Sequence, residues 1–508
     1  MHPKFASQGH ALHKKNDEKE RNEKKIMDKN KEQHLKKRPS VKLSIMPLVV
    51  LVVLLIITIR AFGSDSLSGA SQITLLVAAA FCILVGMAYL NVPWASFEKA
   101  ITKNVASVSS ALIILLLIGA LSGAWMVSGV VPTLIYYGTQ AIHPDVFLAS
   151  TCIISALVSL MTGSSWTTIA TIGIALMGIG RAQGFGEGWI AGTIISGAYF
   201  GDKISPLSDT TVMASGSVGV SLFKHIKYML VTTVPTMVLT IIIFTIAGFL
   251  CQTNSSQHIE VFTSAITQRF HVTPWLLSVP VLTGVLIARR TPPLITLFLS
   301  ILLAVGAGLI WQRDVLQEID PSLFRASMMS VYGSTALPTH NEMLTSLVAT
   351  RGMAGMMGTI WLIICAMCFG GAMTAGGFVG GITRLFVHLV RGRVSLVGST
   401  AATGLMLNIA IADQYLCILL TGNMFKEVFD REGYERRLLS RTVEDAVTVT
   451  SVLVPWNTCG MTQATVLGVS TFTYLPYCFF NLISPIMSVV VAATGYKIFH
   501  KKPEAETE

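Results

Sequence analysis

Charged residues are scarce in this chain. They make up 13% of its 508 residues, whereas hydrophobic residues make up 52%. Apolar runs of about 18 residues or more recur along the sequence, and runs of that length can cross a bilayer as helices. Little sequence remains for a water-soluble catalytic domain. The composition therefore predicts an all-α polytopic membrane protein.

Motifs for nucleotides and soft metals are missing from the sequence. The glycine-rich segment at 368–381 contains no phosphate-loop lysine and lies in an apolar run, a pattern typical of close helix packing. The eight cysteines are scattered, and Cys365 and Cys368 lie in an apolar run where cysteine acts as a small hydrophobe. We therefore expect no enzyme activity, no cofactor, no disulfide framework and no ATP-driven pump.

Positive charge is concentrated at the amino terminus. Residues 1–44 hold 13 Lys and Arg against 6 Asp and Glu, which accounts for +7 of the total charge of +10. A nucleic-acid-binding arm is the alternative, but this segment directly precedes an apolar span. The position predicts a disordered cytoplasmic tail that follows the positive-inside rule, and no nucleic-acid partner.

The longest polar insert divides the chain into two halves. We expect about 11 to 13 transmembrane or half-spanning helices, because several apolar segments are too short to cross alone. The predicted organisation is a basic tail at 1–44, a first transmembrane half at 45–311, a polar connector at 312–356, a second transmembrane half at 357–497 and a cytoplasmic tail at 498–508.

The two halves resemble each other weakly. Short matches occur at offsets of 245 to 248 residues: GEGW at 186–189 with REGY at 431–434, SPL at 205–207 with SVL at 451–453, and DTT at 209–211 with NTC at 457–459. TGSSWTT at 162–168 falls on AIADQYL at 410–416, another polar break in an apolar run. Chance similarity is the alternative. A true duplication predicts inverted repeats with broken helices that meet at a shared site.

Ionisable side chains within the apolar segments are the main functional candidates, because each costs about a few kcal/mol or more at membrane depth. They are Asp202, Lys203, Asp209, Asp413, Glu444 and Asp445. Several adjoin residues that interrupt a helix, such as Pro206 and Pro455. The bilayer tolerates a broken helix only where its free backbone groups face protein, water or an ion.

Oxygen-bearing side chains surround these acids, and oxygen is the ligand that hard cations prefer. A carboxylate in such a place can hold either a proton or a cation, so the two compete for one site. We predict Asp209 as the exchangeable carboxylate, with Ser208, Thr210, Asn457 and Thr458 as further ligands of Na⁺ and H⁺. The secondary candidates are Asp202, Asp413, Glu444 and Asp445.

Structural roles remain open for most of these acids. Asp202 and Lys203 could form an ion pair that only stabilises the fold. Asp413 could serve helix packing. Glu444 could be a solvated cap or a partner of Arg441, because it follows a charged connector.

Longer motifs resemble a known family. AGTIISGAYFGDKISPLSDTTVMAS at 191–215 and LSRTVEDAVTVTSVLVPWNTCG at 439–460, together with ADQYL at 412–416 and YLPYCFFNLISP at 474–485, are similar to the NhaC family of sodium/proton antiporters, part of the ion transporter superfamily. The resemblance extends over about residues 45–497. One departure is Val452, which stands where the family pattern has a proline.

The resemblance implies a secondary antiporter of a bacterial inner membrane that exchanges cytoplasmic Na⁺ for external H⁺, with both chain termini in the cytoplasm. Similar sequences also carry malate, lactate or amino acids, which leaves a sodium- or proton-coupled transporter of organic anions or amino acids as the alternative. In that alternative, Lys203 would bind the carboxylate of the cargo. The expected partners are the lipid bilayer, Na⁺ and H⁺, with a small carboxylate and a second copy of the chain as open alternatives.

Overall fold

The computed structural model describes residues 39–62, 69–251, 256–289, 291–335, 337, 345 and 348–501. Within these residues the regular structure is helical, and the β-structure consists of the isolated bridges Thr335–Thr350 and Tyr434–His500. Eight helices are long and apolar enough to cross a membrane, or ten if each of two bent pairs is one span. The predicted all-α polytopic fold is confirmed.

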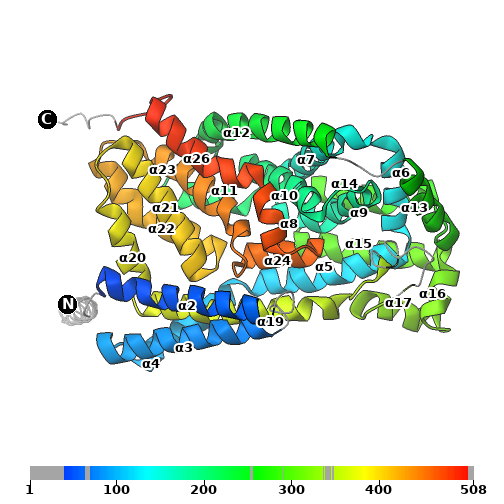
Figure 1. The fold of residues 1–508 in the computed structure, drawn as a ribbon, viewed down its shortest axis with the longest axis horizontal. Helices are drawn as coiled ribbons and strands as arrows, with labels where there is room; N and C mark the ends of the chain where they lie inside the picture. Colours follow the sequence, from blue (N-terminus) through cyan, green and yellow to red (C-terminus); the bar gives the residue numbers. More distant parts are fainter. Residues whose placement is uncertain are drawn as a thin grey trace, which may run out of the picture.

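Long helices form the frame of the molecule. They are α2 (Val41–Phe62), α3 (Ala70–Leu90), α5 (Ser109–Val127), α7 (Pro144–Thr162), α12 (Leu222–Leu250), α15 (Pro293–Trp311), α19 (Met357–Ala375) and α21 (Arg393–Ile411). In Figure 1, α12 runs along the upper edge, while α2, α3 and α19 run along the lower edge. Large apolar side chains such as Val53 on α2 and Phe249 on α12 are exposed, as expected of surfaces that face lipid.

Shorter helices fill the space within and beside this frame. They are α4 (Trp94–Ser107), α6 (Val130–Ala141), α9 (Ile174–Ala182), α13 (Ser256–Arg269), α14 (Ser278–Ala288), α16 (Arg313–Ile319), α17 (Leu323–Tyr332), α20 (Phe378–Val387) and α22 (Gln414–Arg431), with 3₁₀ turns η3 (Pro274–Leu277) and η4 (Met353–Met356). The predicted polar connector at 312–356 thus contains α16 and α17, and α17 packs against α5.

Broken helices occupy the centre. They are α8 (Ser165–Thr168) with the π-helix η2 (Ile169–Gly173), α10 (Glu187–Ile204) with α11 (Asp209–Val218), α23 (Arg436–Val443) with the π-helix η5 (Glu444–Thr448), η6 (Ser451–Leu453) with α24 (Thr458–Leu467), and α25 (Thr471–Tyr474) with η7 (Leu475–Tyr477) and α26 (Phe479–Thr494). Figure 1 shows α8, α10 and α24 between the upper and lower long helices. The breaks explain why several apolar segments do not cross as single helices.

Close packing of α10 on α7 fixes the position of the break between α10 and α11. A Cβ atom at Gly197 would lie 2.1 Å from the carbonyl oxygen of Cys152, and one at Gly201 would lie 2.2 Å from that of Ala156. Only glycine permits this approach, in the manner of small-residue contacts between membrane helices. The end of α10 is therefore held firmly against α7.

Matched contacts in the two halves support the predicted repeat. Ser159 on α7 donates to the carbonyl oxygen of Ala198 at 2.5 Å, and Asn408 on α21 donates to that of Val447 at 2.7 Å. Both bonds join residues 39 positions apart. The donors are 249 residues apart in the sequence, one more than the offset between the two polar breaks.

The helix caps repeat in the same register. Side chains of Ser164 and Asp413 cap α8 and α22, and those of Ser208 and Asn457 cap α11 and α24. Members of each pair are again 249 residues apart. In each half, a helix therefore starts at membrane depth, and a polar side chain accepts a hydrogen bond from its free backbone N–H groups.

The predicted tails lie largely outside the described residues. Helix α2 begins at Val41, inside the predicted tail at 1–44. At the other end, Glu435 N donates to Phe499 O at 3.0 Å, and Lys501 N donates to Gly433 O at 2.8 Å. The first residues of the predicted tail at 498–508 are thus bound to the loop before α23.

Candidate cation site

The helix breaks converge on one region at the centre of the molecule. The π-helix η5 contacts α11, α21, α22 and α26, while α8 contacts α10. A π-helix widens the backbone turn and is often found at functional sites. Helix α11 of the first half therefore meets η5 of the second half here, and the contacting residues Thr210 and Glu444 are 234 positions apart in the sequence.

Asp202 lies at the end of α10 and caps the start of α8. Its Oδ2 accepts hydrogen bonds from the backbone N of Ser165 at 3.2 Å and from the Ser165 hydroxyl at 2.7 Å. The side chain is buried, so the helix N–H groups replace water around the carboxylate. Asp202 therefore binds the end of α10 to the start of α8.

Glu444 is the least satisfied carboxylate of the region. It is fully buried on η5, and its Oε1 accepts a hydrogen bond from Thr210 Oγ1 at 3.1 Å. Its Oε2 has no hydrogen-bond partner within the described residues, and neither does the buried hydroxyl of Thr448 one turn later. A buried oxygen without a donor is costly, which makes it a natural place for a proton or a cation.

Hydroxyl groups extend the Glu444 site towards α10. Ser208 Oγ and Thr210 Oγ1 lie 2.9 Å apart, and Ser208 is close to Asp202 as well. The segment at 205–208 reaches this place because α10 ends before Pro206 and α11 starts at Asp209. We call Glu444, Asp202, Ser208, Thr210 and Thr448 the central oxygen cluster.

A buried ion pair lies beside this cluster. Lys203 Nζ contacts Asp445 Oδ1, and both side chains are fully buried. Asp445 also accepts hydrogen bonds from Thr232 at 3.1 Å and Ser488 at 2.6 Å, and Lys203 donates to Ser484 at 3.0 Å. The ammonium of Lys203 is thus engaged by Asp445, and the alternative of a local Asp202–Lys203 pair is not what the structure shows.

Arg441 is a third buried charge near the pair. Its Nε lies 3.9 Å from Asp445 Oδ2, and its guanidinium carbon lies 4.4 Å from the centre of the Tyr228 ring. Its three nitrogens form no hydrogen bond within the described part of the chain. Arg441 therefore lies beside Asp445, whereas Glu444 is buried against Thr210 and is not a solvated cap.

The predicted leading residue, Asp209, is not buried in the central oxygen cluster. It is the first residue of α11, and it is exposed. The structure brings together four of the predicted residues: Ser208, Thr210, Asp202 and Glu444. Asp209 is their neighbour in the sequence, but among the described residues it forms no hydrogen bond with Glu444. The role of Asp209 stays a prediction.

Asp413, Asn457 and Thr458 form a second polar group. Asp413 is buried and accepts from the backbone N of Leu416 at 2.8 Å, while Asn457 Nδ2 donates to Asn408 O at 3.2 Å. Thr458 Oγ1 donates to Asn457 Oδ1 at 3.4 Å. Their observed contacts are those of helix caps, and a role in ion binding stays a prediction.

Sequence reasoning missed the hydroxyls around the ion pair. Thr232 is one threonine among several in α12, and nothing in its local sequence distinguishes it. Ser484 and Ser488, by contrast, are four residues apart on α26, on either side of Pro485. Two serines on one face of an apolar helix next to a proline are a signal that could have indicated a polar interior face.

The charges of the region do not balance when all groups are ionised. The buried acids are Asp202, Glu444 and Asp445, whereas the buried bases are Lys203 and Arg441. Within the described residues, no group of three or more His, Cys, Asp or Glu side chains could hold a metal ion. The region therefore has an excess negative charge and oxygen ligands, which suit a monovalent cation or a proton better than a transition metal.

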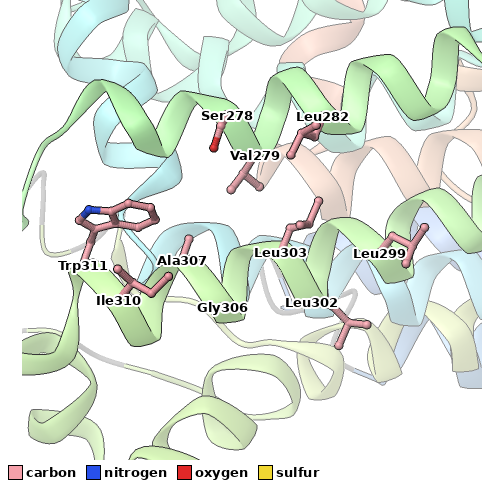
Figure 2. A pocket seen from close by; sticks show the side chains of 10 residues that line it. All are labelled: Ser278, Val279, Leu282, Leu299, Leu302, Leu303, Gly306, Ala307, Ile310 and Trp311. Atoms are coloured by element: carbon pink, nitrogen blue, oxygen red, sulfur yellow. The ribbon is translucent and has the colours of Figure 1, made fainter.

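A surface pocket lies apart from these residues. Figure 2 shows it between α14 and α15, where Val279, Leu282, Leu299 and Leu303 line it. Three of these lining side chains are exposed: Leu282, Leu299 and Leu303. The pocket is an apolar groove between two helices and holds none of the candidate acids.

Comparison with known proteins identifies extended similarity. A sequence model described as the Na⁺/H⁺ antiporter family matches residues 14–195 and 197–496. The Na⁺/H⁺ antiporter NhaC of Alkalihalophilus pseudofirmus is 36% identical over 417 residues, which are 82% of this chain and 89% of that one.

Relatives named for other cargoes are almost as similar. The malate-2H⁺/Na⁺-lactate antiporter of Bacillus subtilis is 35% identical to this chain. The aligned region covers 85% of this chain and 91% of that one. The arginine/ornithine antiporter ArcD of Halobacterium salinarum is 31% identical, with 93% of this chain and 96% of that one covered. The similarity thus extends over nearly the whole membrane region in each comparison.

Proposed function

This chain belongs to the Na⁺/H⁺ antiporter family, and from that premise we propose that it exchanges cytoplasmic Na⁺ for external H⁺ across a bacterial inner membrane. It is a multi-pass transporter and not an enzyme. The direction of exchange, the membrane and the ion-binding residues are parts of the proposal.

The observation that carries the site assignment is the unpartnered Oε2 of the buried Glu444. Thr210, Ser208 and Thr448 supply neutral oxygens around it, and Asp202 supplies a second carboxylate. We assign the exchangeable charge to Glu444, with Asp202 as the second acid of the central oxygen cluster.

The excess negative charge of the buried region explains how Na⁺ and H⁺ transport can be coupled. When all groups are ionised, Asp202, Glu444 and Asp445 exceed Lys203 and Arg441 by one negative charge. Such an uncompensated charge at membrane depth is costly in any conformation that excludes water. Binding of either Na⁺ or H⁺ removes that charge. The protein then changes its access from one side to the other only when one of the two ions is bound, so their fluxes are coupled.

The arrangement of the chain ends supports a common side for both termini. The start of α2 and the end of α26 lie at the same end of the molecule in Figure 1. The basic residues that precede α2 favour the cytoplasm for that end.

Substitution of Glu444 tests the proposed function. In proteoliposomes, Glu444→Gln is expected to reduce Na⁺-driven proton movement to the level of empty liposomes at every pH, because the amide cannot exchange a proton for a cation. The matched control is Glu427→Gln, an exposed acid on α22, which should transport like the wild type. Wild-type exchange by a folded Glu444→Gln protein would rule out this assignment.

Carriage of an organic anion or an amino acid is the second candidate. The relatives named for malate and lactate and for arginine and ornithine support it. So does Arg441, whose buried nitrogens have no hydrogen-bond partner among the described residues. Because Asp445 engages Lys203, Arg441 is the better candidate for binding a carboxylate. Uptake of labelled malate, lactate or arginine into Na⁺-loaded proteoliposomes decides between the candidates.

A further inference from the structure

Lys203 occupies a place that is lined by oxygen atoms. Its ammonium contacts a carboxylate oxygen of Asp445 and the hydroxyl of Ser484 at 3.0 Å. The hydroxyls of Thr232 and Ser488 are held on the two oxygens of the same carboxylate, at 3.1 and 2.6 Å. The Lys203 ammonium therefore contacts a carboxylate that two further hydroxyls also bind, while Arg441 Nε lies 3.9 Å from the other oxygen of that carboxylate.

This ligand set is more than an ion pair needs. A lysine and an aspartate that only stabilise the fold can be replaced by apolar residues of similar size, often at no loss of stability. Here, two separate helices add hydroxyls: Thr232 comes from α12, and Ser484 and Ser488 come from α26. Carboxylate and hydroxyl oxygens are the ligands of hard cations.

Lys203 and Asp445 belong to different halves of the chain. Lys203 is in the last turn of α10, next to the break at 205–208, whereas Asp445 is part of the π-helix η5 in the other half. The pair is thus a contact between the two halves, and it can open if α10 and η5 separate. Both side chains are fully buried, so opening leaves Asp445 in need of another cation.

We propose that Asp445, Thr232, Ser484 and Ser488 form a second Na⁺ site, which the ammonium of Lys203 fills as a tethered cation when Na⁺ is absent from it. We call these four residues the Asp445 site. It is separate from the central oxygen cluster, because its ligands come from α12, η5 and α26. The inference rests on the proposed function in one respect, which is that Na⁺ reaches this depth of the protein.

The tethered cation gives the ion pair a role in the exchange. With Lys203 bound, the Asp445 site is neutral without Na⁺. When Na⁺ takes the site, the ammonium is released towards Glu444, with which it interacts electrostatically. The lysine thereby links occupancy of the Asp445 site to the charge of the central oxygen cluster.

Removal of the tethered cation tests the proposal. We expect purified Lys203→Gln to bind an additional Na⁺ ion per chain relative to the wild type, measured with ²²Na⁺ by equilibrium dialysis. Its unfolding temperature should rise more in NaCl than in choline chloride at equal ionic strength, because binding stabilises the folded state. Lys227→Gln, an exposed lysine of α12, is the matched control and should bind Na⁺ like the wild type.

A second substitution identifies the ligand. Lys203→Gln combined with Asp445→Asn should lose the additional ion, since no carboxylate remains in the Asp445 site. Additional binding that survives Asp445→Asn would overturn the proposal. So would a Lys203→Gln protein that binds no extra Na⁺, or one that unfolds equally in both salts.

Glu444→Gln separates this proposal from the proposed function. Lys203→Gln with Glu444→Gln should still bind one more Na⁺ than Glu444→Gln alone, because the Asp445 site does not contain Glu444. If Glu444→Gln leaves transport unchanged while Lys203→Gln gains an ion, the proposed function fails and the Asp445 site stands. If Glu444→Gln abolishes transport and Lys203→Gln gains nothing, the reverse holds.

Discussion

Glu444 and Asp209 illustrate how burial decides the value of a carboxylate. Both acids lie beside helix breaks, and the sequence favours Asp209 because a proline and two threonines surround it. In the structure, Asp209 is exposed at the start of α11, whereas Glu444 is fully buried and its Oε2 has no hydrogen-bond partner in the described part of the chain. Water already satisfies an exposed carboxylate, so a buried one gains more from binding an ion.

Thr210 and Asp209 are adjacent, and substitutions at the two positions distinguish the two assignments. We expect Thr210→Val to weaken the apparent Na⁺ affinity about tenfold or more, because a contact with a charged group contributes about 1.5–3 kcal/mol. The measurement is the Na⁺ dependence of proton movement in proteoliposomes. Asp209→Asn should change it little.

The opposite pattern would favour the assignment based on sequence. If Asp209→Asn abolishes exchange while Thr210→Val leaves the Na⁺ dependence unchanged, Asp209 is the exchangeable carboxylate. Retention of wild-type exchange by Asp209→Asn at every pH would exclude that role.

Helix breaks create the site at the scale of elements. Where α10 ends, Thr211 Oγ1 donates to Lys203 O at 3.0 Å, and Ser208 caps α11. The free backbone groups of the break are thus satisfied by local hydroxyls and not by lipid. This leaves the side chains of Asp202 and Lys203 free to turn into the centre of the molecule.

Glycine at the α7–α10 contact provides a prediction at this scale. Gly201→Ala should destabilise the protein by about 1–3 kcal/mol, because its Cβ would lie 2.2 Å from the Ala156 carbonyl oxygen and 2.5 Å from the Leu160 nitrogen. The displaced end of α10 should also lower the transport rate. Thermal unfolding in detergent and proton movement in proteoliposomes measure the two effects.

Gly216 on α11 is the matched control. A Cβ atom there meets nothing within 4 Å, so Gly216→Ala should leave stability unchanged or raise it by up to about 1 kcal/mol through helix propensity. Equal stability of the Gly201→Ala and Gly216→Ala proteins would show that α7 and α10 are not held by this contact.

The carboxyl-terminal residues form a second inter-element contact. Arg437 stacks on Phe499, with its guanidinium carbon 3.4 Å from the ring centre, and Tyr228 OH donates to Lys497 O at 2.9 Å. Arg441 lies over the other part of this aromatic group, on Tyr228. A continuous set of contacts therefore joins the end of the chain to the helix that carries Glu444 and Asp445.

The whole molecule joins two related halves around one polar centre. Two hydrophobic clusters flank that centre: one is built largely from α5, α7, α10 and α15, and the other from α2, α3, α19 and α21. Lys203 from the first half meets Asp445 from the second between them. Relative movement of the halves therefore changes the contacts of the ions directly.

The position of both chain ends provides a prediction at this scale. Cysteines introduced at Ser40 and Tyr496, which are exposed, should react with a membrane-impermeant maleimide from the same side. The background protein has Cys251 and Cys368 replaced by serine, because the other six native cysteines are buried. We expect labelling in everted vesicles and none in right-side-out vesicles, since the basic residues before α2 favour the cytoplasm.

Labelling of the two cysteines from opposite sides would contradict the common location of the termini. The control is Lys99→Cys on α4 in the same background, which reports that the reagent reaches exposed positions near the membrane. Labelling of both introduced cysteines only in right-side-out vesicles would place both ends outside the cell.

The sequence by itself determined the membrane class, the positions of the helix breaks and a short set of ionisable candidates. Those features depend on local composition: apolar runs must become helices in lipid, and Pro206 or Pro455 interrupts them wherever it occurs. The sequence also predicted a repeat, with chance similarity as the alternative, because the polar breaks recur at nearly constant spacing.

Only the tertiary structure decided which candidates act together. Asp202 caps α8, Lys203 pairs with Asp445 across the two halves, and Glu444 keeps a free oxygen. None of these facts is local, because burial and partners come from helices that lie some 240 residues away. A carboxylate binds an ion by virtue of what surrounds it, and the fold alone sets those surroundings.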